Sequence, residues 1–310
     1  LHKISKFLVK HGVTGFLATT VTAPFEKLKA VIRTVHKAIM PDASGAEILG
    51  IHLEGPWINR EKAGSQPIRW IREPSIDEFL KLHEESRGKI KMVTLAPELN
   101  GALELIKQAT RLGIVSSVGH SLATYEEVVK ASKLGLSHAT HMFNAMGSFH
   151  HRAPGVVGAV LALDDISADV IVDGNHVHPT AIKLLIKAKG TDKVCLITDS
   201  TSFAGLPPGN YKISEDLTIV VKNNTCWLPS GRIFGSALTM EKAVKNVLKF
   251  TEISLKDAIK MASYNPARVL GLDQEIGSLD VGKCANIVML DGDLNVETTI
   301  VRGRVGFRKE

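Results

Sequence analysis

Residues 113–144, GIVSSVGHSLATYEEVVKASKLGLSHATHMFN, contain the pattern that decides the fold of this chain of 310 residues. A short run of β-branched and apolar residues at 113–121 is followed by apolar residues at helical spacing at 124–135, and then by a second apolar run at 136–144. Strand-like runs that alternate with helices predict right-handed crossovers between parallel strands. The same unit recurs along most of the chain.

Seven runs of this kind occur before residue 201. They are VTGFLATT (13–20), EILGIHLEGP (47–56), KMVTLAPE (91–98), GIVSSVGHS (113–121), LSHATHMFN (136–144), DVIVDGNH (169–176) and KVCLITDS (193–200). Helical patterns lie between them at 24–40, 75–86, 102–113, 124–135 and 178–190. Each run ends in a polar residue, which is typical of the carboxyl ends of strands in a barrel. We therefore predict an α/β fold with a (β/α)8 barrel.

The number of runs leaves two interpretations open. A closed barrel of this kind needs eight strands, and the chain supplies seven runs. Either one strand–helix unit is misread, or the first strand precedes residue 1. We favour the second interpretation, because the rhythm begins abruptly at Val13 after only a helix-like segment at 4–12.

The pattern changes after residue 200. Segments 205–214 and 219–228 predict turns and a hairpin, and helical patterns follow at 237–251 and 254–263. The tail at 276–309 alternates short strands with Gly and Asp turns. Because this tail is too short for an independent sheet, we expect it to pair with strands from a segment before residue 1.

The composition narrows the functional class. With 44% apolar residues, the chain can bury the core of one large domain, or of one large and one small domain. No uncharged apolar run reaches about 18 residues, which argues against a membrane span. The net charge of +6 is spread without interleaved aromatic residues, which gives nucleic-acid binding no support. Three widely spaced cysteines, Cys195, Cys226 and Cys284, indicate reduced thiols and a cytoplasmic location.

Four strand ends carry residues suited to a metal hydrolase: Glu54, His120, His141 and Asp199. Strand ends meet in a closed barrel, so one carboxylate and two imidazoles could bind a divalent ion and leave a position for water. Asp199 could take the proton of that water and later return it. Each residue also has a simpler interpretation: a glutamate in a turn, histidines at a rim, and an aspartate that caps a turn.

A second group of polar residues suits an anion. His176 follows the run at 169–176, and Asn144 and Arg152 lie on the loop after the run at 136–144. Arginine binds phosphate through two parallel hydrogen bonds. For Arg152, the alternative is an ordinary loop residue in solvent.

Several strings together resemble the N-acetylglucosamine-6-phosphate deacetylase family of the amidohydrolase superfamily, over essentially the whole chain. In the family's order they are HLEGPWIN (52–59), KAGSQP (62–67), LAPE (95–98), VGHS (118–121), ATHMFNAM (139–146), DGNHVHP (173–179), TDSTSFAG (198–205), GSALTM (235–240), YNPAR (264–268) and ANIVMLD (285–291). The resemblance implies a metal-dependent barrel over 1–275 and, over 276–310, the C-terminal part of a small, incomplete β-sandwich made from both chain ends.

The resemblance also implies a reaction: hydrolysis of the acetamide of N-acetylglucosamine 6-phosphate to glucosamine 6-phosphate and acetate. Glu54, His120 and His141 would hold one divalent metal ion, most often zinc, and Asp199 would act as general base and then acid on the metal-activated water. The substrate-binding residues that it implies are Gln66, Asn144, Ala145, Arg152, His176, Gly235 and Ser236. Some of them would reach across a homodimer interface to the phosphorylated amino sugar.

Two departures from the family pattern matter. Many members carry a histidine at the position of Gln66, where it helps to polarise the acetamide carbonyl, and a glutamine amide can donate a hydrogen bond but cannot carry charge. The second departure is the first barrel strand, which we expect to precede residue 1. In the superfamily this strand bears an H-x-H-like element, which some relatives use for a second metal ion. The set of Glu54, His120 and His141 is complete without it.

Two other functions compete with this hypothesis. A cyclic-amide hydrolase on the same barrel usually bridges two metals with a modified lysine, and none of the strand ends offers a lysine in that role. A barrel that has lost catalysis and serves as an assembly subunit typically lacks at least one metal ligand. All three ligands are present here.

Overall fold

The computed structural model describes residues 1–39, 45–212 and 218–310. Seven parallel strands form one sheet in the order of the sequence. They are β1 (Gly15–Thr19), β2 (Glu47–Glu54), β3 (Ile90–Leu95), β4 (Val115–Val118), β5 (Leu136–Ala139), β6 (Ser167–Ile171) and β7 (Val194–Ile197). Five of the seven predicted runs contain one of these strands, and the runs at 91–98 and 169–176 overlap β3 and β6, which begin one and two residues earlier. The α/β class and the parallel sheet are therefore confirmed.

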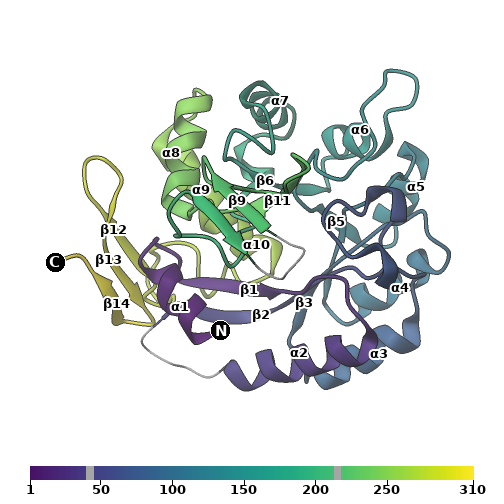
Figure 1. Ribbon diagram of the computed structural model, residues 1–310, viewed down its shortest axis with the longest axis horizontal. Coiled ribbons are helices and arrows are strands. Elements are labelled where there is room, and N and C mark those ends of the chain that lie inside the picture. The colour runs from purple at the N-terminus through teal and green to yellow at the C-terminus, as the bar shows by residue number, and fades with distance from the viewer. Residues whose placement is uncertain (40–44, 213–217) are drawn as a thin grey trace.

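The sheet is curved, and helices lie around its outer side (Figure 1). They are α2 (Phe25–Ala38), α3 (Ile76–Glu85), α4 (Ala102–Arg111), α5 (Tyr125–Ser132), α6 (Gly155–Ala162) and α7 (Pro179–Lys189). Three 3-10 turns, η1 (Arg60–Lys62), η2 (Ile68–Trp70) and η3 (Thr191–Lys193), lie in the connections. Residue 40 of the predicted helix at 24–40 lies outside the described residues.

The parallel sheet has β1 and β7 as its two edges. Helices α8 (Met240–Phe250), α9 (Leu255–Ala262) and α10 (Tyr264–Val269) contact β7. The patterns at 237–251 and 254–263 predict α8 and α9. The sheet thus has the shape of part of a barrel.

A four-stranded antiparallel sheet follows β7 in the chain. Its strands are β8 (Gly209–Lys212), β9 (Thr218–Lys222), β10 (Thr225–Trp227) and β11 (Ile233–Ser236). The predicted hairpin is β9–β10, and its two turn residues, Asn223 and Asn224, have φ of 52° and 60°. Such left-handed values match the tight turn that joins twisted strands, and asparagine tolerates them well. Residues 213 and 214 of the predicted segment 205–214 lie outside the described residues.

The tail forms a third sheet of β12 (Ile287–Leu290), β13 (Val296–Val301) and β14 (Arg304–Arg308). In the described part of the chain these strands pair with one another, and α1 (His2–Val9) packs against them. Val9 and Val301 are buried together, and the Thr299 hydroxyl donates a hydrogen bond to the Val9 carbonyl at 2.7 Å. The N-terminal helix α1 and the C-terminal sheet are thus adjacent, as Figure 1 shows.

The interior side of the parallel sheet carries polar side chains beneath the strand ends. His52 on β2 bonds the Thr94 hydroxyl at 2.7 Å, and Thr94 bonds Thr140 at 2.6 Å. Thr140 in turn bonds Ser117 at 2.6 Å. Because all four residues are buried, this chain of hydrogen bonds ties β2, β3, β4 and the end of β5 together where the candidate site begins.

Across the described ranges, none of the helices has the length and apolar character needed to cross a membrane.

Candidate metal and catalytic site

Three of the predicted strand-end residues converge. Glu54 is the last residue of β2, while His120 and His141 each stand two residues beyond the ends of β4 and β5. His120 Nε2 lies 3.0 Å from Glu54 Oε1 and 3.0 Å from His141 Nε2, and His141 Nε2 lies 3.8 Å from Glu54 Oε1. All three residues are buried. The curvature of the sheet therefore brings these three strand ends together, as the sequence pattern predicted.

The backbone at these strand ends is in an uncommon conformation. His120, His141 and Asp199 have φ of 50°, 36° and 45°, and Ala145 nearby has 52°. A residue other than glycine held in this region costs of the order of 1–3 kcal/mol and persists only where surrounding structure imposes it. At His120 and His141 this conformation accompanies the convergence of the two rings on Glu54.

The ring of His120 is oriented by a main-chain carbonyl. Its Nδ1–H donates to the Lys62 carbonyl at 2.8 Å, because a carbonyl oxygen can only accept. The other ring nitrogen, Nε2, faces the Glu54 carboxylate with its lone pair unless a proton or a cation lies between the two atoms. Two acceptors this close need a positive charge between them, which a divalent cation would supply.

The dimensions of the cluster suit such an ion. A tetrahedral ion with bonds of about 2.0–2.2 Å separates its ligand atoms by roughly 3.3–3.5 Å. The three separations between Glu54, His120 and His141 run from 3.0 to 3.8 Å. The residues present therefore fit one divalent cation.

The pKa values of Glu54 and His141 also favour a positive charge at this place. Burial by itself raises the pKa of Glu54, but its hydrogen bonds with His120 and His141 outweigh burial and hold this pKa well below the ordinary value. Burial by itself lowers the pKa of His141, but the hydrogen bond and the charge of Glu54 raise it to about 9. A buried carboxylate that stays ionised and an imidazole that keeps its proton mark a place that attracts positive charge.

Asp169 holds the main chain of His141 in place, and the sequence pattern did not predict this residue. Its Oδ1 accepts a hydrogen bond from the His141 main-chain N–H, and its Oδ2 bonds His138 Nε2 at 3.2 Å. The Met142 N–H donates to the Asp169 main-chain carbonyl at 2.9 Å. A polar residue at an inward position of β6 was the available signal, because such a residue needs a buried partner.

Gln66 lies against Glu54. Its Nε2 donates to Glu54 Oε1 at 2.7 Å, and its Oε1 accepts from the Thr22 main-chain N–H at 2.7 Å. Gln66 is buried, on the loop that follows β2. The structure therefore places Gln66 beside the cluster.

Asp199 follows β7 by two residues, in a segment that is exposed at the surface. Desolvation by the protein groups around its carboxyl, and next the negative charge of Glu54, raise its pKa to about 7. Asp199 itself is exposed, so this desolvation comes from the protein groups around its carboxyl at the edge of the sheet. The residue is not fully enclosed. A carboxyl with a pKa near neutrality can both take up and release a proton at physiological pH.

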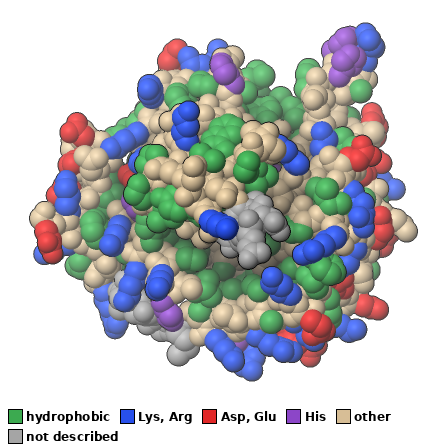
Figure 2. Space-filling view, in the orientation of Figure 1, with side chains coloured by type: hydrophobic (Ala, Val, Ile, Leu, Met, Phe, Trp, Pro, Cys, Tyr) green, Lys and Arg blue, Asp and Glu red, His purple; other side chains and the backbone are tan. Residues whose placement is uncertain are grey.

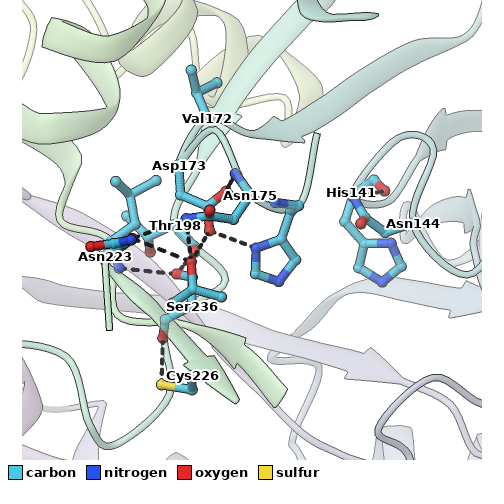
Figure 3. Close-up of polar contacts among 12 residues, drawn as sticks. His141, Asn144, Val172, Asp173, Asn175, Thr198, Asn223, Cys226 and Ser236 are labelled. Atoms are coloured by element: carbon cyan, nitrogen blue, oxygen red, sulfur yellow. Dashed lines mark hydrogen bonds and ion pairs between the residues drawn. The ribbon is translucent and has the colours of Figure 1, made fainter. Parts of the chain in front are cut away.

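His176 is fixed by Asp173 and by the β9–β10 hairpin. Its Nδ1 lies 2.6 Å from Asp173 Oδ2, and the Thr225 hydroxyl donates to the same oxygen at 2.8 Å. Asn175 Nδ2 donates to the Thr225 hydroxyl at 2.9 Å. Figure 3 shows Asp173 and Asn175 within this network and His141 on the opposite side of the view. The hydrogen bond to His176 holds the pKa of Asp173 below its ordinary value in spite of burial, which raises it.

Two further predicted residues belong to the second sheet. Gly235 has φ of 73°, and a Cβ there would lie 2.7 Å from the Thr201 side chain, so only glycine fits. The Ser236 hydroxyl donates to the Thr198 carbonyl, and the Ser236 N–H donates to the Asp199 carbonyl at 3.2 Å. Both residues thus hold the turn that presents Asp199, and Figure 3 shows Ser236 beside Thr198.

The remaining predicted residues lie on the connection between β5 and α6. Asn144 Nδ2 donates to the His141 carbonyl at 3.2 Å, and the Ala145 carbonyl accepts from the Ser121 N–H at 3.1 Å. Both contact the loops that carry His120 and His141.

Arg152 lies instead on an exposed arm, residues 147–153, where its Nη1 lies 2.7 Å from His151 Nε2. The arm projects beside α6 in Figure 1, and Figure 2 shows histidine and basic side chains at its tip. The structure therefore does not fold Arg152 in among the strand-end residues.

Comparison with known proteins places this site in a family. The chain matches the amidohydrolase family over residues 1–306. N-acetylglucosamine-6-phosphate deacetylase of Bacillus subtilis (strain 168) is 40% identical over 307 residues, which cover 98% of this chain and 77% of that protein. N-acetylgalactosamine-6-phosphate deacetylase of Escherichia coli O157:H7 is 35% identical over 305 residues, which cover 98% and 80%.

A solved structure agrees with these relatives. The crystal structure of N-acetylglucosamine-6-phosphate deacetylase from Thermotoga maritima superposes with a TM-score of 0.91 at 41% identity, over 99% of this chain and 83% of that one. The chain is therefore a member of the amidohydrolase family and an enzyme of the group that contains the N-acetylglucosamine-6-phosphate deacetylases.

Proposed function

We propose that this protein hydrolyses the acetamide of N-acetylglucosamine 6-phosphate to glucosamine 6-phosphate and acetate. The observation that carries the proposal is the convergence of Glu54, His120 and His141 at the carboxyl ends of the parallel strands. The negative charge of Glu54 raises the pKa of Asp199, which supports placing Asp199 at the same edge of the sheet. Deacetylases of amino-sugar phosphates match almost the whole chain, which supports this substrate class.

The cofactor in this proposal is one divalent ion, with zinc as the first choice, because imidazole and carboxylate ligands suit it. Glu54, His120 and His141 would hold the ion. When bound, it would lower the pKa of a water molecule and polarise the acetamide carbonyl.

Asp199 is the proton carrier in this proposal. Its carboxylate would accept the proton of the attacking water and then, as a carboxylic acid, pass that proton to the departing amine. The upward direction of its pKa supports both steps, because the group must change protonation state twice in each turnover.

The substrate would be held by two groups of residues. Gln66 would lie at the acetamide, with the second hydrogen of Nε2 directed to its carbonyl oxygen, and Gly235 and Ser236 would line the pocket. His176, Asn144, the Ala145 backbone and Arg152 would bind the sugar phosphate. Because Arg152 stands on the exposed arm 147–153, we propose that it reaches the site of a second copy in a homodimer.

The finer architecture is also part of the proposal. β1 and β7 are the edges of the parallel sheet, and an eighth strand between them would complete a (β/α)8 barrel. Residues 1–275 would then be the barrel, and 276–310 would be the C-terminal part of a small β-sandwich. Three free thiols, Cys195, Cys226 and Cys284, support a reducing cytoplasmic compartment.

The test is release of acetate from N-acetylglucosamine 6-phosphate by the full-length protein with added Zn²⁺. Asp199→Asn should lower kcat by about 10²–10⁴-fold, because a positioned general acid–base contributes that much. Asp293→Asn, at an exposed turn between β12 and β13, is the matched control and should leave kcat unchanged. Turnover of Asp199→Asn within tenfold of the unaltered protein would refute the assigned mechanism.

The same assay decides the sugar. A deacetylase of N-acetylgalactosamine 6-phosphate is among the relatives, so both sugar phosphates should be offered, together with N-acetylglucosamine that lacks the phosphate. We expect the highest kcat/KM on N-acetylglucosamine 6-phosphate and a large loss without the phosphate. Equal activity on the unphosphorylated sugar would contradict the proposed phosphate site.

A further inference from the structure

The carboxamide of Gln66 is fixed at both of its ends. Its Oε1 accepts from the Thr22 main-chain N–H and its Nε2 donates to Glu54 Oε1, each at 2.7 Å. The orientation is unambiguous, because a main-chain N–H can only donate and an ionised carboxylate can only accept. A side chain with 7% of its surface exposed has no solvent with which to exchange these bonds.

The partners of Gln66 are themselves immobile. Thr22 is 1% exposed, and it lies so close to the end of β2 that a Cβ on Gly55 would stand 2.3 Å from its hydroxyl oxygen. Glu54 is the last residue of β2 and is buried. Gln66 therefore connects the loop after β1 to a carboxylate at the end of β2.

This connection restricts the Glu54 carboxylate. The last torsion of a glutamate is broad, so a free carboxylate samples many rotations. With Oε1 held by Gln66, the group is directed so that this oxygen also lies 3.0 Å from His120 Nε2. Outer hydrogen bonds of this kind orient metal ligands and change metal affinity.

We propose that Gln66 is a positioning residue of the metal site, which orients Glu54 for the ion through Nε2 and takes its own orientation from the Thr22 main chain. This role rests on the proposed function, but it precedes substrate: it exists in the enzyme before any acetamide enters. It predicts that loss of the Gln66 carboxamide weakens metal binding in substrate-free protein. A residue that contacted only the acetamide carbonyl would affect turnover and leave metal affinity alone.

The experiment measures the zinc dissociation constant of substrate-free, full-length protein by competition with a chromophoric chelator. Gln66→Leu removes both hydrogen bonds without adding a charge or a metal ligand, and its zinc affinity should fall by about 10–100-fold. Gln66→Met, which keeps the length of the side chain, should show a loss in the same direction and provides the result if the leucine variant does not fold. Gln274→Leu, at an exposed position after α10, is the control and should bind zinc like the unaltered protein.

Thermal unfolding of the metal-free variants identifies any that are unfolded. Unchanged zinc affinity in folded Gln66→Leu or Gln66→Met overturns the inference, even if deacetylation is lost. Weakened zinc binding supports it, even if the unaltered protein fails to release acetate, in which case the proposed substrate is wrong and the positioning role stands. Failure of the unaltered protein to bind zinc at all would overturn both.

Discussion

His120 illustrates how a main-chain group orients a candidate metal ligand. The Lys62 carbonyl accepts a hydrogen bond from the Nδ1–H of His120, which leaves the other nitrogen of the ring to face Glu54. The Asp169 carboxylate holds the His141 main chain in the same way from the opposite side. A distance of 3.0 Å between the two Nε2 atoms depends on both constraints. At this scale, orientation and not mere proximity makes the site.

Asp169 yields a prediction about stability. Asp169→Asn keeps the size of the side chain but offers only one acceptor oxygen to two partners, the His141 N–H and His138 Nε2. The free energy of unfolding should fall by about 1–3 kcal/mol, since one buried group loses its partner. Chemical denaturation of metal-free protein measures this, with Asp293→Asn as the control. An unaltered unfolding midpoint would show that the Asp169 contacts contribute nothing.

The sequence predicted part of this residue-scale picture. Glu54, His120, His141 and Asp199 could be named because each follows an apolar run, where a polar side chain is conspicuous. Asp169 and Asp173 could not, because both lie within the run DVIVDGNH and nothing local distinguishes them from turn aspartates. Their partners come from residues 28 and 52 positions away, at His141 and Thr225, and no periodicity reports such distances.

At the scale of elements, the alternation of strands and helices was predictable where each helix has one buried face. Residues 28, 32 and 35 of α2 are buried while its opposite side is polar, which gives the expected spacing. Helix α6 is different: five consecutive residues, 156–160, are buried, so no period could be read and the helix was missed. Strand β11 was missed because it is short and contains Gly235.

The contact between His11, which follows α1, and Glu241 in the first turn of α8 carries a pH dependence. The hydrogen bond from His11 Nδ1, at 3.0 Å, and that from Thr239 hold the pKa of Glu241 below its ordinary value in spite of burial, which raises it. A carboxyl whose pKa is lower in the folded state contributes stability above its unfolded pKa of about 4.3 and loses it as pH falls through the folded value. Glu241 should therefore stabilise the protein at pH 7 and cease to do so in acid.

Glu241→Gln tests this dependence. The difference in the free energy of unfolding between the unaltered protein and Glu241→Gln should be present at pH 7 and shrink as pH is lowered from 5 toward 3. Denaturation at several pH values, on protein without metal, provides the measurement. A difference that stays constant over that range would show that the carboxylate charge plays no part in the contact between His11 and α8.

At the scale of the whole molecule, the proposed function makes the arm 147–153 the part that determines whether one chain would contain a complete site. Arg152 stands on this arm, and among the described residues its guanidinium bonds His151. A homodimer would bring the arm of one copy to the strand ends of the other, and the self-complementary contact of a two-fold axis would complete both sites at once.

Complementation between two inactive variants tests that arrangement. Arg152→Ala and Asp199→Asn should each be impaired alone. After mixing and subunit exchange, a heterodimer should contain one site with both residues intact, so activity should recover to about a quarter of the unaltered level. No recovery, with exchange verified, would place Arg152 in the site of its own chain or outside any site.

The curvature of the parallel sheet was harder to predict than its class. The seven runs gave a curved parallel sheet, but pairing between strand neighbours says nothing of how far the sheet curls. The three-stranded sheet of the tail was expected to need outside strands; here α1 supplies part of its support through Val9 and Thr299. Such packing between chain ends depends on separations of hundreds of residues, which local patterns do not encode.

The most direct measurement is anomalous diffraction from crystals of the zinc-loaded protein, recorded on both sides of the zinc absorption edge. The account predicts one peak within about 2.0–2.2 Å of Glu54 oxygen and of the Nε2 atoms of His120 and His141. A peak at other residues, or no peak in protein that releases acetate, would contradict it.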